Sequence, residues 1–549
     1  MHRLNRVNDA VHMFMGDLTS RLVAESGRAE DRFHLGKMIL QSLKDAPDHV
    51  MQIDGGTGEM ETNASALKRT VQCATAMKNV GLGCGDVIAL MAPNHLDLAI
   101  PFYAAFYLGV AVAAVDRALS VKELQDTFRV IKPKLIFCQS EKAPDIQLAL
   151  NQLDLGAEIV TFDKGEFLCS FPKFLEKYSD DKPIEEFRAA DFDPDTTIAT
   201  LIPTSGTTGI PKSAAISHKN FSISCPYLWS RYTKFPTPTR MALIGSPLQW
   251  LTAILHYIIS PIMKYTRLQT SGVFNPEHAV YLIRKYKPTY MVLSPIISSS
   301  LLKFGDEECD FTSFELILLG GSAVPPDLID EIKKRSPHTE VFNVFGMTEL
   351  TTVGFHTEDP PPGSCGKPIG CFQYRIVNAE TQQDVTEPNV RGELWVKGPA
   401  IFKGYYNNPK ATLETFAEDG WFKTGDMFYR DEHWNFFFVE RIKLLLKYKS
   451  HQISPVELET VIRGHPGVQE VAVTGIPDPE LGDLPVACVV RRPGHDVAAQ
   501  DIKDLVKESL SESKQLHGGV VFFEDLPMTA SAKINRKKLK EMIVKMERE

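Results

Sequence analysis

The sequence predicts an α/β protein: a large N-terminal part built on parallel sheets, a β-rich part after it, and a small α+β domain at the end. Three observations support this prediction. The 549 residues exceed what a single hydrophobic core supports, so two or more domains are expected. Through the first 350 residues, short apolar runs alternate with amphipathic segments, as they do in βαβ units. After about residue 360 the pattern changes to hairpins with Gly, Pro and Asn turns.

The apolar runs of the first part are predicted to be buried strands. Parallel strands are covered on both faces, which explains their continuous apolar character. These strands are expected at 87–91, 135–137, 159–162, 290–293 and 316–319. The stretch 98–115 has 18 residues without a charge, which is the threshold for a transmembrane helix. Pro101 and Gly109 interrupt it, so we expect a buried helix, a glycine turn and a buried strand.

Composition and charge exclude some functions and some cellular locations. A formal net charge of −9 argues against nonspecific nucleic-acid binding, which needs a basic surface. The nine cysteines are scattered singly, without a CxxC pair, which favours free thiols in a reducing compartment over disulfides or a zinc site. The N-terminus lacks the apolar core of a signal peptide, and residues 547–549 are not a peroxisomal Ser-Lys-Leu address. We therefore expect an intracellular protein without an integral membrane segment, cytoplasmic or, as the alternative, peroxisomal.

The domain boundary is predicted near Arg441. The β-rich part includes 392–398, and a basic segment at 439–449 then precedes a compact tail with its own α/β alternation. This gives a large domain at 1–440 and a small domain at 441–549.

Residues 203–213 are the most informative segment of the chain. They follow the predicted strand 196–202 and combine hydroxyl side chains, two glycines and a lysine, as a loop around a polyphosphate does. The spacing excludes a Walker A loop, which needs four residues between its first glycine and the Gly-Lys pair. The alternative is an ordinary polar surface loop.

Two further clusters suit a nucleotide. The glycine pair at 320–321 directly follows the strand 316–319, where it either lets a flat ring or a phosphate lie against backbone or simply makes a tight turn. The loop 343–349 holds an aromatic ring, a glycine, a hydroxyl and a carboxylate. Such a loop can stack a base, contact a phosphate and supply an oxygen ligand to Mg²⁺.

The last third of the chain adds a carboxylate and two cations. Asp426 lies among glycine turns and can accept the hydroxyls of a ribose, as acidic residues do in other nucleotide sites. Arg441 follows 15 positions later and can reach the same sugar or its phosphate. Lys533 precedes a basic helical stretch, in a loop of small residues.

In order and spacing, these clusters resemble the adenylate-forming superfamily of acyl-CoA synthetases, 4-coumarate–CoA ligases, beetle luciferases and peptide-synthetase adenylation domains. The resemblance runs from about residue 50 to 540. It rests on the segments TSGTTGIPK, GGSA, FGMTE, GELWVKG, GYYNNP, WFKTGD and ERIK with ISPVELE. The segments KYKSHQ and GGVVF place the chain nearest the insect luciferase and 4-coumarate–CoA ligase branch. The whole chain most resembles non-luminous, insect luciferase-like acyl-CoA synthetases.

The resemblance implies a fold and a reaction. The fold is a large αβαβα domain with parallel-rich sheets and a β-rich subdomain, followed by a small mobile α+β domain. In the reaction, a carboxylate attacks the α-phosphate of ATP to give an acyl-adenylate and pyrophosphate, and the thiol of CoA then attacks the activated carbonyl. ATP, Mg²⁺ and CoA are the implied cofactors and co-substrates. A medium- or long-chain fatty acid is the expected substrate.

The resemblance also implies roles for individual residues. Nucleotide binding is implied for Thr204, Ser205, Gly206, Thr207, Thr208, Gly209, Lys212, Gly321, Ser322, Ala323, Asn343, Phe345, Gly346, Asp426, Arg441 and Gln452. Catalytic roles are implied for Lys533 between carboxylate and phosphate, Thr348 at the α-phosphate, Glu349 on Mg²⁺ and Lys447 in the second step. The acyl pocket would include Trp250, Thr252 and Thr352, and Lys443 matches the hinge of the small domain.

Several positions depart from the family pattern. Family glycines are replaced by Ser213, Ser450 and Ala532, so we expect strained or shifted loops and a slower reaction, because a Cβ resists positive φ. Trp250 stands where luciferases have a histidine, and Ser224 where they have an arginine. These changes disfavour a flat heteroaromatic acid and favour a flexible acyl chain. Two alternative functions are a luciferase-like oxygenase and a nucleotide-binding pseudoenzyme with weak or no ligase activity. For Trp250 itself, the alternative is an ordinary large core residue.

Overall fold

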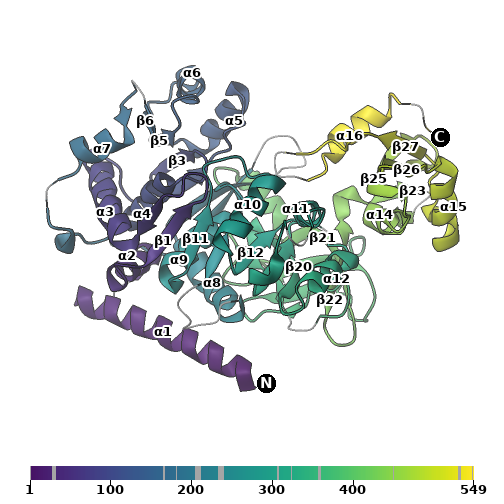
Figure 1. The fold of residues 1–549 in the computed structure, drawn as a ribbon, viewed down its shortest axis with the longest axis horizontal. Helices are drawn as coiled ribbons and strands as arrows, with labels where there is room; N and C mark the ends of the chain where they lie inside the picture. The colour runs from purple at the N-terminus through teal and green to yellow at the C-terminus, as the bar shows by residue number, and fades with distance from the viewer. Residues whose placement is uncertain are drawn as a thin grey trace.

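The chain forms a large N-terminal part and a smaller C-terminal part, which lies at the right of Figure 1 in this computed structural model. The structure describes residues 2–27, 33–164, 167–180, 182–204, 212–232, 240–305, 308–322, 324–356, 360–448, 451–529, 533–546 and 548. A long helix, α1 (His2–Ser26), runs along the edge of the large part and packs against α2 (Leu35–Asp45) and α8 (His218–Tyr232).

Two seven-stranded sheets form the frame of the large part, and all their strand pairs are parallel except the last pair of each. The first sheet has the order β7 (Cys169–Ser170), β6 (Glu158–Thr161), β5 (Leu135–Cys138), β3 (Val87–Met91), β4 (Ala111–Ala114), β8 (Ile198–Thr204) and β9 (Lys212–Ser217). The second has the order β14 (Glu340–Val344), β13 (Leu316–Gly320), β12 (Tyr290–Leu293), β10 (Met241–Leu243), β11 (Thr266–Gln269), β1 (Val50–Asp54) and β2 (Met60–Thr62). The predicted strands of the first 350 residues are confirmed.

Helices form three layers around these sheets. A separate hydrophobic core joins each layer to the sheet face or faces that it covers. The layer between the sheets contains α2, α3 (Asn63–Asn79), α4 (Ala99–Leu108) and α9 (Leu251–Met263). The outer face of the first sheet is covered by α5 (Val121–Ile131) and α6 (Ala143–Leu153). The helix α7 (Phe171–Tyr178) packs on α3 instead, and its Phe171 and Phe174 belong to the core between the sheets. The outer face of the second sheet is covered by α10 (Pro276–Tyr286), α11 (Pro295–Leu301) and α12 (Pro326–Arg335). The αβαβα arrangement is therefore confirmed.

The apolar stretch at 98–115 folds as predicted. All of α4 is buried, and it ends at Gly109, whose φ of 70° lies in the left-handed region that glycine adopts without strain. The chain then enters β4, also fully buried. Within the described ranges, no helix combines the length and apolar character needed to cross a membrane.

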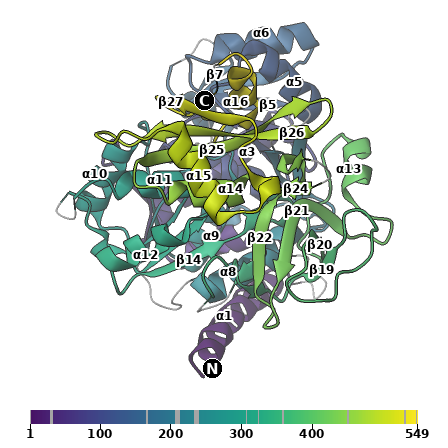
Figure 2. The ribbon, with the colours of Figure 1, turned by 90° about the vertical axis from the view of Figure 1, so that its right-hand side faces the viewer.

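The β-rich part and the C-terminal part each have a sheet of their own. An antiparallel sheet follows the order β19 (Gln373–Val377), β20 (Gly392–Lys397), β21 (Phe422–Arg430) and β22 (Phe436–Arg441). The C-terminal sheet has the order β24 (His451–Ile453), β23 (Leu446–Tyr448), β26 (Gly482–Arg491) and β25 (Val468–Asp478), and β27 (Gly519–Phe523) pairs with β26. The helices α14 (Pro455–Arg463), α15 (Ala499–Ser509) and α16 (Arg536–Ile543) pack on this sheet, which faces the viewer in Figure 2. The boundary at Arg441 stays a prediction.

Candidate active site

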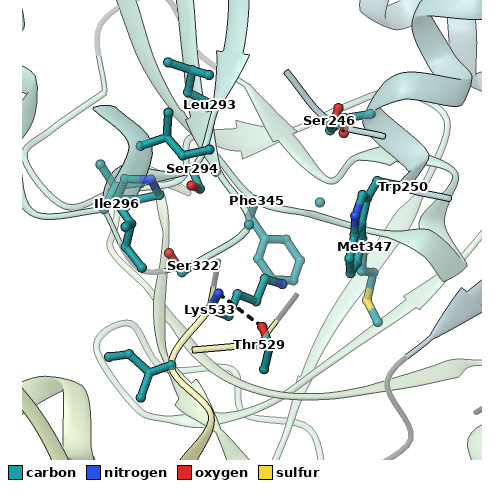
Figure 3. Close-up of a pocket in the computed structure, with 18 of the residues that line it drawn as sticks. Ser246, Trp250, Leu293, Ser294, Ile296, Ser322, Phe345, Met347, Thr529 and Lys533 are labelled. Atoms are coloured by element: carbon teal, nitrogen blue, oxygen red, sulfur yellow. Dashed lines mark hydrogen bonds between the residues drawn. The ribbon is translucent and has the colours of Figure 1, made fainter. Parts of the chain in front are cut away.

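A cavity of about 2510 Å³ lies between the large part and the C-terminal part. It opens at the carboxyl ends of the second sheet's parallel strands, where α/β proteins bind ligands. Its walls come from segments far apart in the sequence, at 244–252, 320–322, 343–349, 422–426, 438–446 and 526–540. The structure thus brings the predicted clusters to one place, and Figure 3 shows part of their lining.

Phe345 and two glycines shape one wall of the cavity. The Phe345 ring lies near Phe428 and Phe438, with ring centres 4.9 and 6.2 Å away, and it extends into the cavity in Figure 3. A Cβ on Gly320 would come within 2.6 Å of the Val344 carbonyl oxygen, and Gly321 has a φ of 88°. The turn therefore requires glycine at both positions. This wall offers an aromatic face and exposed backbone to a flat ring.

Asp426 and Arg441 meet at the next wall, because β21 and β22 pair these two residues directly. Asp426 is 1% exposed, and Arg441 Nε lies 3.3 Å from its Oδ1. That contact lacks hydrogen-bond geometry, so Oδ1 is a buried acceptor without a hydrogen bond among the described residues. Burial raises the pKa of Asp426 to about 7, and Arg441 opposes the shift. The carboxylate is poised to accept ligand hydroxyls.

Glu349 lies in a third cluster with Lys212 and Tyr405. Glu349 is buried, which raises the pKa of its carboxyl group, while a hydrogen bond from Tyr405 and the charges of Arg441 and Lys212 oppose that shift. Tyr405 Oη donates to Glu349 Oε1 over 2.8 Å, and Lys212 Nζ is 4.8 Å from the centre of the Tyr405 ring. Sequence reasoning did not assign Tyr405 a role, although its segment GYYNNP was part of the resemblance.

Glu349 could supply one of the several oxygen ligands that a divalent cation needs. A buried carboxylate whose protonated form is favoured by desolvation gains from a nearby cation. The described residues contain no group of three or more His, Cys, Asp or Glu side chains that could hold a metal ion. Mg²⁺ at Glu349 would therefore need phosphate and water oxygens for its other positions, as is usual for this ion.

Lys533 reaches the cavity from the C-terminal part. Its backbone N–H donates to Thr529 Oγ1 over 3.2 Å, and Met528 pairs with Ile534 across the turn. Lys533 lines the cavity, where desolvation and the charge of Arg441 lower its pKa and the charge of Asp426 raises it. Phe345 lines the same cavity, and Figure 3 labels both residues. Thr529, which sequence reasoning missed, ties down the turn that carries Lys533.

Trp250 and two threonines line the cavity beside β10. Trp250 directly precedes α9, is half-buried and lines the cavity, as Met347 does. Thr252 Oγ1 donates to Ser246 Oγ over 2.9 Å. Thr352 also lines the cavity, and its Oγ1 is buried without a hydrogen-bond partner among the described residues.

Two lysines of the predicted site lie apart from the catalytic cluster. Lys443 is in a short 3₁₀ turn (Ile442–Leu444) at the cavity wall, between β22 and β23. Lys447 lies in β23, exposed and absent from the cavity lining, and its backbone N–H donates to Asp483 Oδ2 over 3.2 Å. The described arrangement therefore brings Lys533, and not Lys447, to the cavity that Phe345 and Asp426 line.

Some predicted residues lie outside the described part of the chain. They are Ser205, Gly206, Thr207, Thr208, Gly209, Ala323, Ser450 and Ala532, together with the side chain of Gln452. The flanks of the 205–211 segment are described: Thr204 ends β8, Lys212 begins β9, and Thr204 Oγ1 donates to the Lys212 carbonyl oxygen over 3.3 Å. Asn343, Gly346, Thr348 and Ser322 all line the cavity.

The strain expected at Ser213 is absent. Ser213 pairs with Pro203 in the regular antiparallel ladder of β8 and β9, and it is not among the described residues with positive φ. Its carbonyl accepts from the Tyr406 N–H over 2.8 Å. The strain is absent because the position is part of a strand, where a Cβ is no obstacle, and the slower reaction stays a prediction.

Two family models match the chain. The model of the AMP-binding enzyme matches residues 40–406, and that of the AMP-binding enzyme C-terminal domain matches residues 457–533. Among curated relatives, luciferin 4-monooxygenase of Photuris pensylvanica is 31% identical over 87% of this chain and 89% of its own. The peroxisomal OPC-8:0-CoA ligase 1 of Arabidopsis thaliana is 27% identical over 89% of both chains.

Solved structures share the fold. ATP-bound MatB from Rhodopseudomonas palustris superposes with a TM-score of 0.83 at 24% identity, covering 93% of this chain and 99% of MatB. The luciferase-like enzyme of the nonluminescent mealworm Zophobas morio has a TM-score of 0.68 at 29% identity, covering 75% of this chain and 96% of its own.

Proposed function

The chain belongs to the AMP-binding enzyme family, and from this we propose that it is an ATP-dependent acid–thiol ligase that makes an acyl-CoA through an acyl-adenylate. The single observation that supports this most is the meeting of Lys533 with Asp426 and Arg441 at one cavity. A cation from the C-terminal part then faces a nucleotide wall of the large part, as the first half-reaction needs. CoA-ligase relatives such as the Arabidopsis enzyme support the thiol acceptor.

The first step needs charge stabilisation more than acid–base groups. When the carboxylate oxygen attacks the α-phosphorus, negative charge spreads over the phosphate oxygens, so cations and oriented donors lower the barrier. In our proposal Lys533 bridges the two reactants and Thr348 donates to the α-phosphate. Lys212 and the hydroxyls beginning at Thr204 hold the outgoing pyrophosphate. Mg²⁺ beside Glu349 would further neutralise the phosphates.

The nucleotide is held by the other walls. In our proposal adenine lies between Phe345 and the backbone of 320–322, where the glycines permit close approach. The ribose hydroxyls donate to Asp426, whose Oδ1 is a ready acceptor, and the charge of Arg441 opposes protonation of that carboxylate. For the second step, Lys443 would act as the hinge that brings Lys447 to the site.

The acid is proposed to be a flexible acyl chain. In our proposal the Trp250 side chain occupies the space where luciferases hold a flat acid. Beyond Trp250, aliphatic side chains line the cavity. The luciferin monooxygenase relative keeps a luciferase-like oxygenase as the second candidate. A pseudoenzyme is the third.

One assay separates these candidates. The full-length protein is given ATP, Mg²⁺ and a panel of carboxylic acids, and pyrophosphate release is measured with and without CoA, beside oxygen consumption. A ligase releases pyrophosphate with its acid and forms a thioester with CoA. Tight ATP binding without pyrophosphate release from any acid would contradict the proposal and indicate a pseudoenzyme. Acid-dependent oxygen uptake without thioester would indicate the oxygenase.

A further inference from the structure

The cavity continues along the second sheet, away from the walls that are proposed to hold the nucleotide. This part of the cavity is called the arm. Four strand residues line it: Tyr290 and Val292 of β12, Leu318 of β13 and Val344 of β14. Alternate residues of a strand share a face, and Tyr290, Val292, Leu318 and Val344 all belong to the core between the two sheets. The intervening Met291 belongs to the opposite core. The arm therefore lies on the α9 side of the sheet.

Helix α9 forms the other wall of the arm. Leu251, Leu255 and Ile259 line it, and a spacing of four residues places them in one stripe of the helix. At about 1.5 Å per residue, the stripe from 251 to 259 is ~12 Å long. The strand segment 240–244 on the other wall is ~13 Å long at about 3.3 Å per residue.

The arm is apolar along its length. Leu255 is 8% exposed, Ile259 4% and Leu318 2%, so its walls are buried aliphatic side chains. A methylene chain matches this lining, because it needs no hydrogen-bond partners. An extended chain advances ~1.2 Å per bond, since three bonds span about 3.5 Å in a peptide. The arm therefore accommodates about ten carbons.

The far end of the arm is polar. Arg240, Tyr265 and Tyr290 lie at the amino ends of the adjacent strands β10, β11 and β12, opposite the nucleotide edge, and His256 of α9 joins them. Together these four residues are called the polar cap. His256 Nδ1 and Tyr265 Oη are 2.8 Å apart in a hydrogen bond, and the His256 and Tyr290 rings are 5.3 Å apart.

The polar cap carries one cation and several hydrogen-bonding groups. Arg240 is 8% exposed, and its Nη2 lies 3.2 Å from Oε2 of Glu315, which is outside the cavity lining. Burial lowers the pKa of His256 to about 3, so its imidazole is neutral. A methyl end group would desolvate this set without replacing any hydrogen bond, which is unfavourable for buried polar groups.

We propose that the acid is a chain of about ten carbons whose far end carries a hydrogen-bond-accepting oxygen, which the polar cap receives. This inference rests on the proposed ligase function and specifies its substrate class. The apolar arm selects the linear chain, and the polar cap selects the end group.

The test compares three acids of equal length on the full-length enzyme: decanoate, 10-hydroxydecanoate and decanedioate. We expect kcat/KM for pyrophosphate release to be at least ~10-fold higher with an oxygenated acid than with decanoate, because one hydrogen bond to a charged group is worth more than the ~1.4 kcal/mol of a tenfold change. A preference for decanedioate identifies an anion received by Arg240, and a preference for 10-hydroxydecanoate identifies a hydroxyl.

Three variants assign the preference to the polar cap. Arg240→Met and the milder Tyr290→Phe are expected to bring the ratio of oxygenated to plain acid towards one. The matched control Glu315→Gln removes the charge of a residue that pairs with Arg240 from outside the cavity lining, and it is expected to keep the preference. Melting curves show that each variant folds.

The outcomes separate the two proposals. Equal or better use of decanoate by the wild type, or a ratio unchanged in both cap variants, would overturn the polar-cap inference and leave the ligase function standing. If no acid releases pyrophosphate, the ligase proposal fails. Stabilisation of the protein by each acid then still tests the cap, and equal melting shifts from all three overturn it.

Discussion

Asp426 is the residue whose environment departs furthest from that of an ordinary carboxylate. It is buried, its Oδ1 accepts no hydrogen bond among the described residues, and the Arg441 guanidinium beside it is itself half-exposed. Desolvation therefore dominates, and its pKa rises to about 7. The desolvated carboxylate of Asp426 destabilises the folded protein when the site is empty. Hydrogen bonds from ligand hydroxyls would offset this cost, and so favour binding.

We predict that Asp426→Asn stabilises the ligand-free protein at pH 8 and weakens ATP binding. The folded-state pKa lies above the ordinary value, so the folded form takes up a proton between about pH 4 and 7, and stability falls as the pH rises through that window. At pH 8 the variant removes a buried charge, a gain on the order of 1–3 kcal/mol. Melting curves at pH 5 and pH 8 measure this. A variant that is less stable than wild type at pH 8 would contradict the electrostatic account.

Lys533 is predicted to act in the first half-reaction alone. Lys533→Ala removes the cation between carboxylate and phosphate, and adenylate formation is expected to fall by ~10²–10³-fold. Thioester formation from a supplied acyl-adenylate should persist. Lys537→Ala, on α16 at the same cavity, is the matched control and should change both rates little. Equal losses in both half-reactions would argue against separate arrangements for the two steps.

At the scale of elements, the site is formed by segments at the ends of strands. The glycine turn after β13, the segment after β14 and the β21–β22 pair each end at the same cavity, so a regular sheet positions residues from distant parts of the chain. The same regularity explains Ser213, which is an ordinary strand residue 8% exposed in β9.

We predict that Ser213→Gly does not accelerate the enzyme. Glycine adds conformational freedom to the unfolded chain and loses packing in a strand, so the variant should be less stable by ~0.5–1 kcal/mol. Rates of both half-reactions should be unchanged or lower. Chemical denaturation and half-reaction kinetics measure the two effects, and a faster first step would show that Ser213 obstructs the phosphate loop.

At the scale of the whole molecule, a buried charge cluster joins the two parts beside the candidate hinge. Glu440 of β22 is 3% exposed and accepts the Arg441 N–H over 2.9 Å. Burial raises the pKa of Glu440, and the charge of Arg536 from α16 opposes that shift. Arg536 Nη2 is itself 2.8 Å from Glu459 Oε1 on α14. The cluster favours the arrangement in which Lys533 faces the nucleotide walls.

Glu440→Gln is predicted to loosen this arrangement. The amide keeps the hydrogen-bond acceptor and loses the attraction to Arg536, so adenylation should slow by roughly tenfold, equivalent to ~1.4 kcal/mol. The thioester step from supplied acyl-adenylate should not slow. Glu457→Gln is the control, because its ion pair with Lys514 (2.6 Å) lies within the C-terminal part. Unchanged adenylation in Glu440→Gln would contradict a role in docking.

Much of the fold was predictable because it depends on local pattern. Continuous apolar runs mark parallel strands, and the strands at 87–91 and 290–293 were predicted to the residue. Phe345, Asp426 and Lys533 were identified from their motifs. Tyr405 and Thr529 were not, because their contacts with Glu349 and Lys533 arise only in the folded structure, which no motif spacing reveals.

The sequence by itself determined the family, the two parallel sheets and the residue types that meet at the nucleotide, since these depend on periodicity and short motifs. Only the tertiary structure decided what lies between distant segments. Arg240, His256, Tyr265 and Tyr290 belong to no motif, and they form the polar cap because adjacent parallel strands begin at one edge beneath α9. Likewise, the pKa of Asp426 follows from burial and not from its neighbours in the chain. Desolvation and the direction of a side chain are properties of packing, which sequence spacing does not encode.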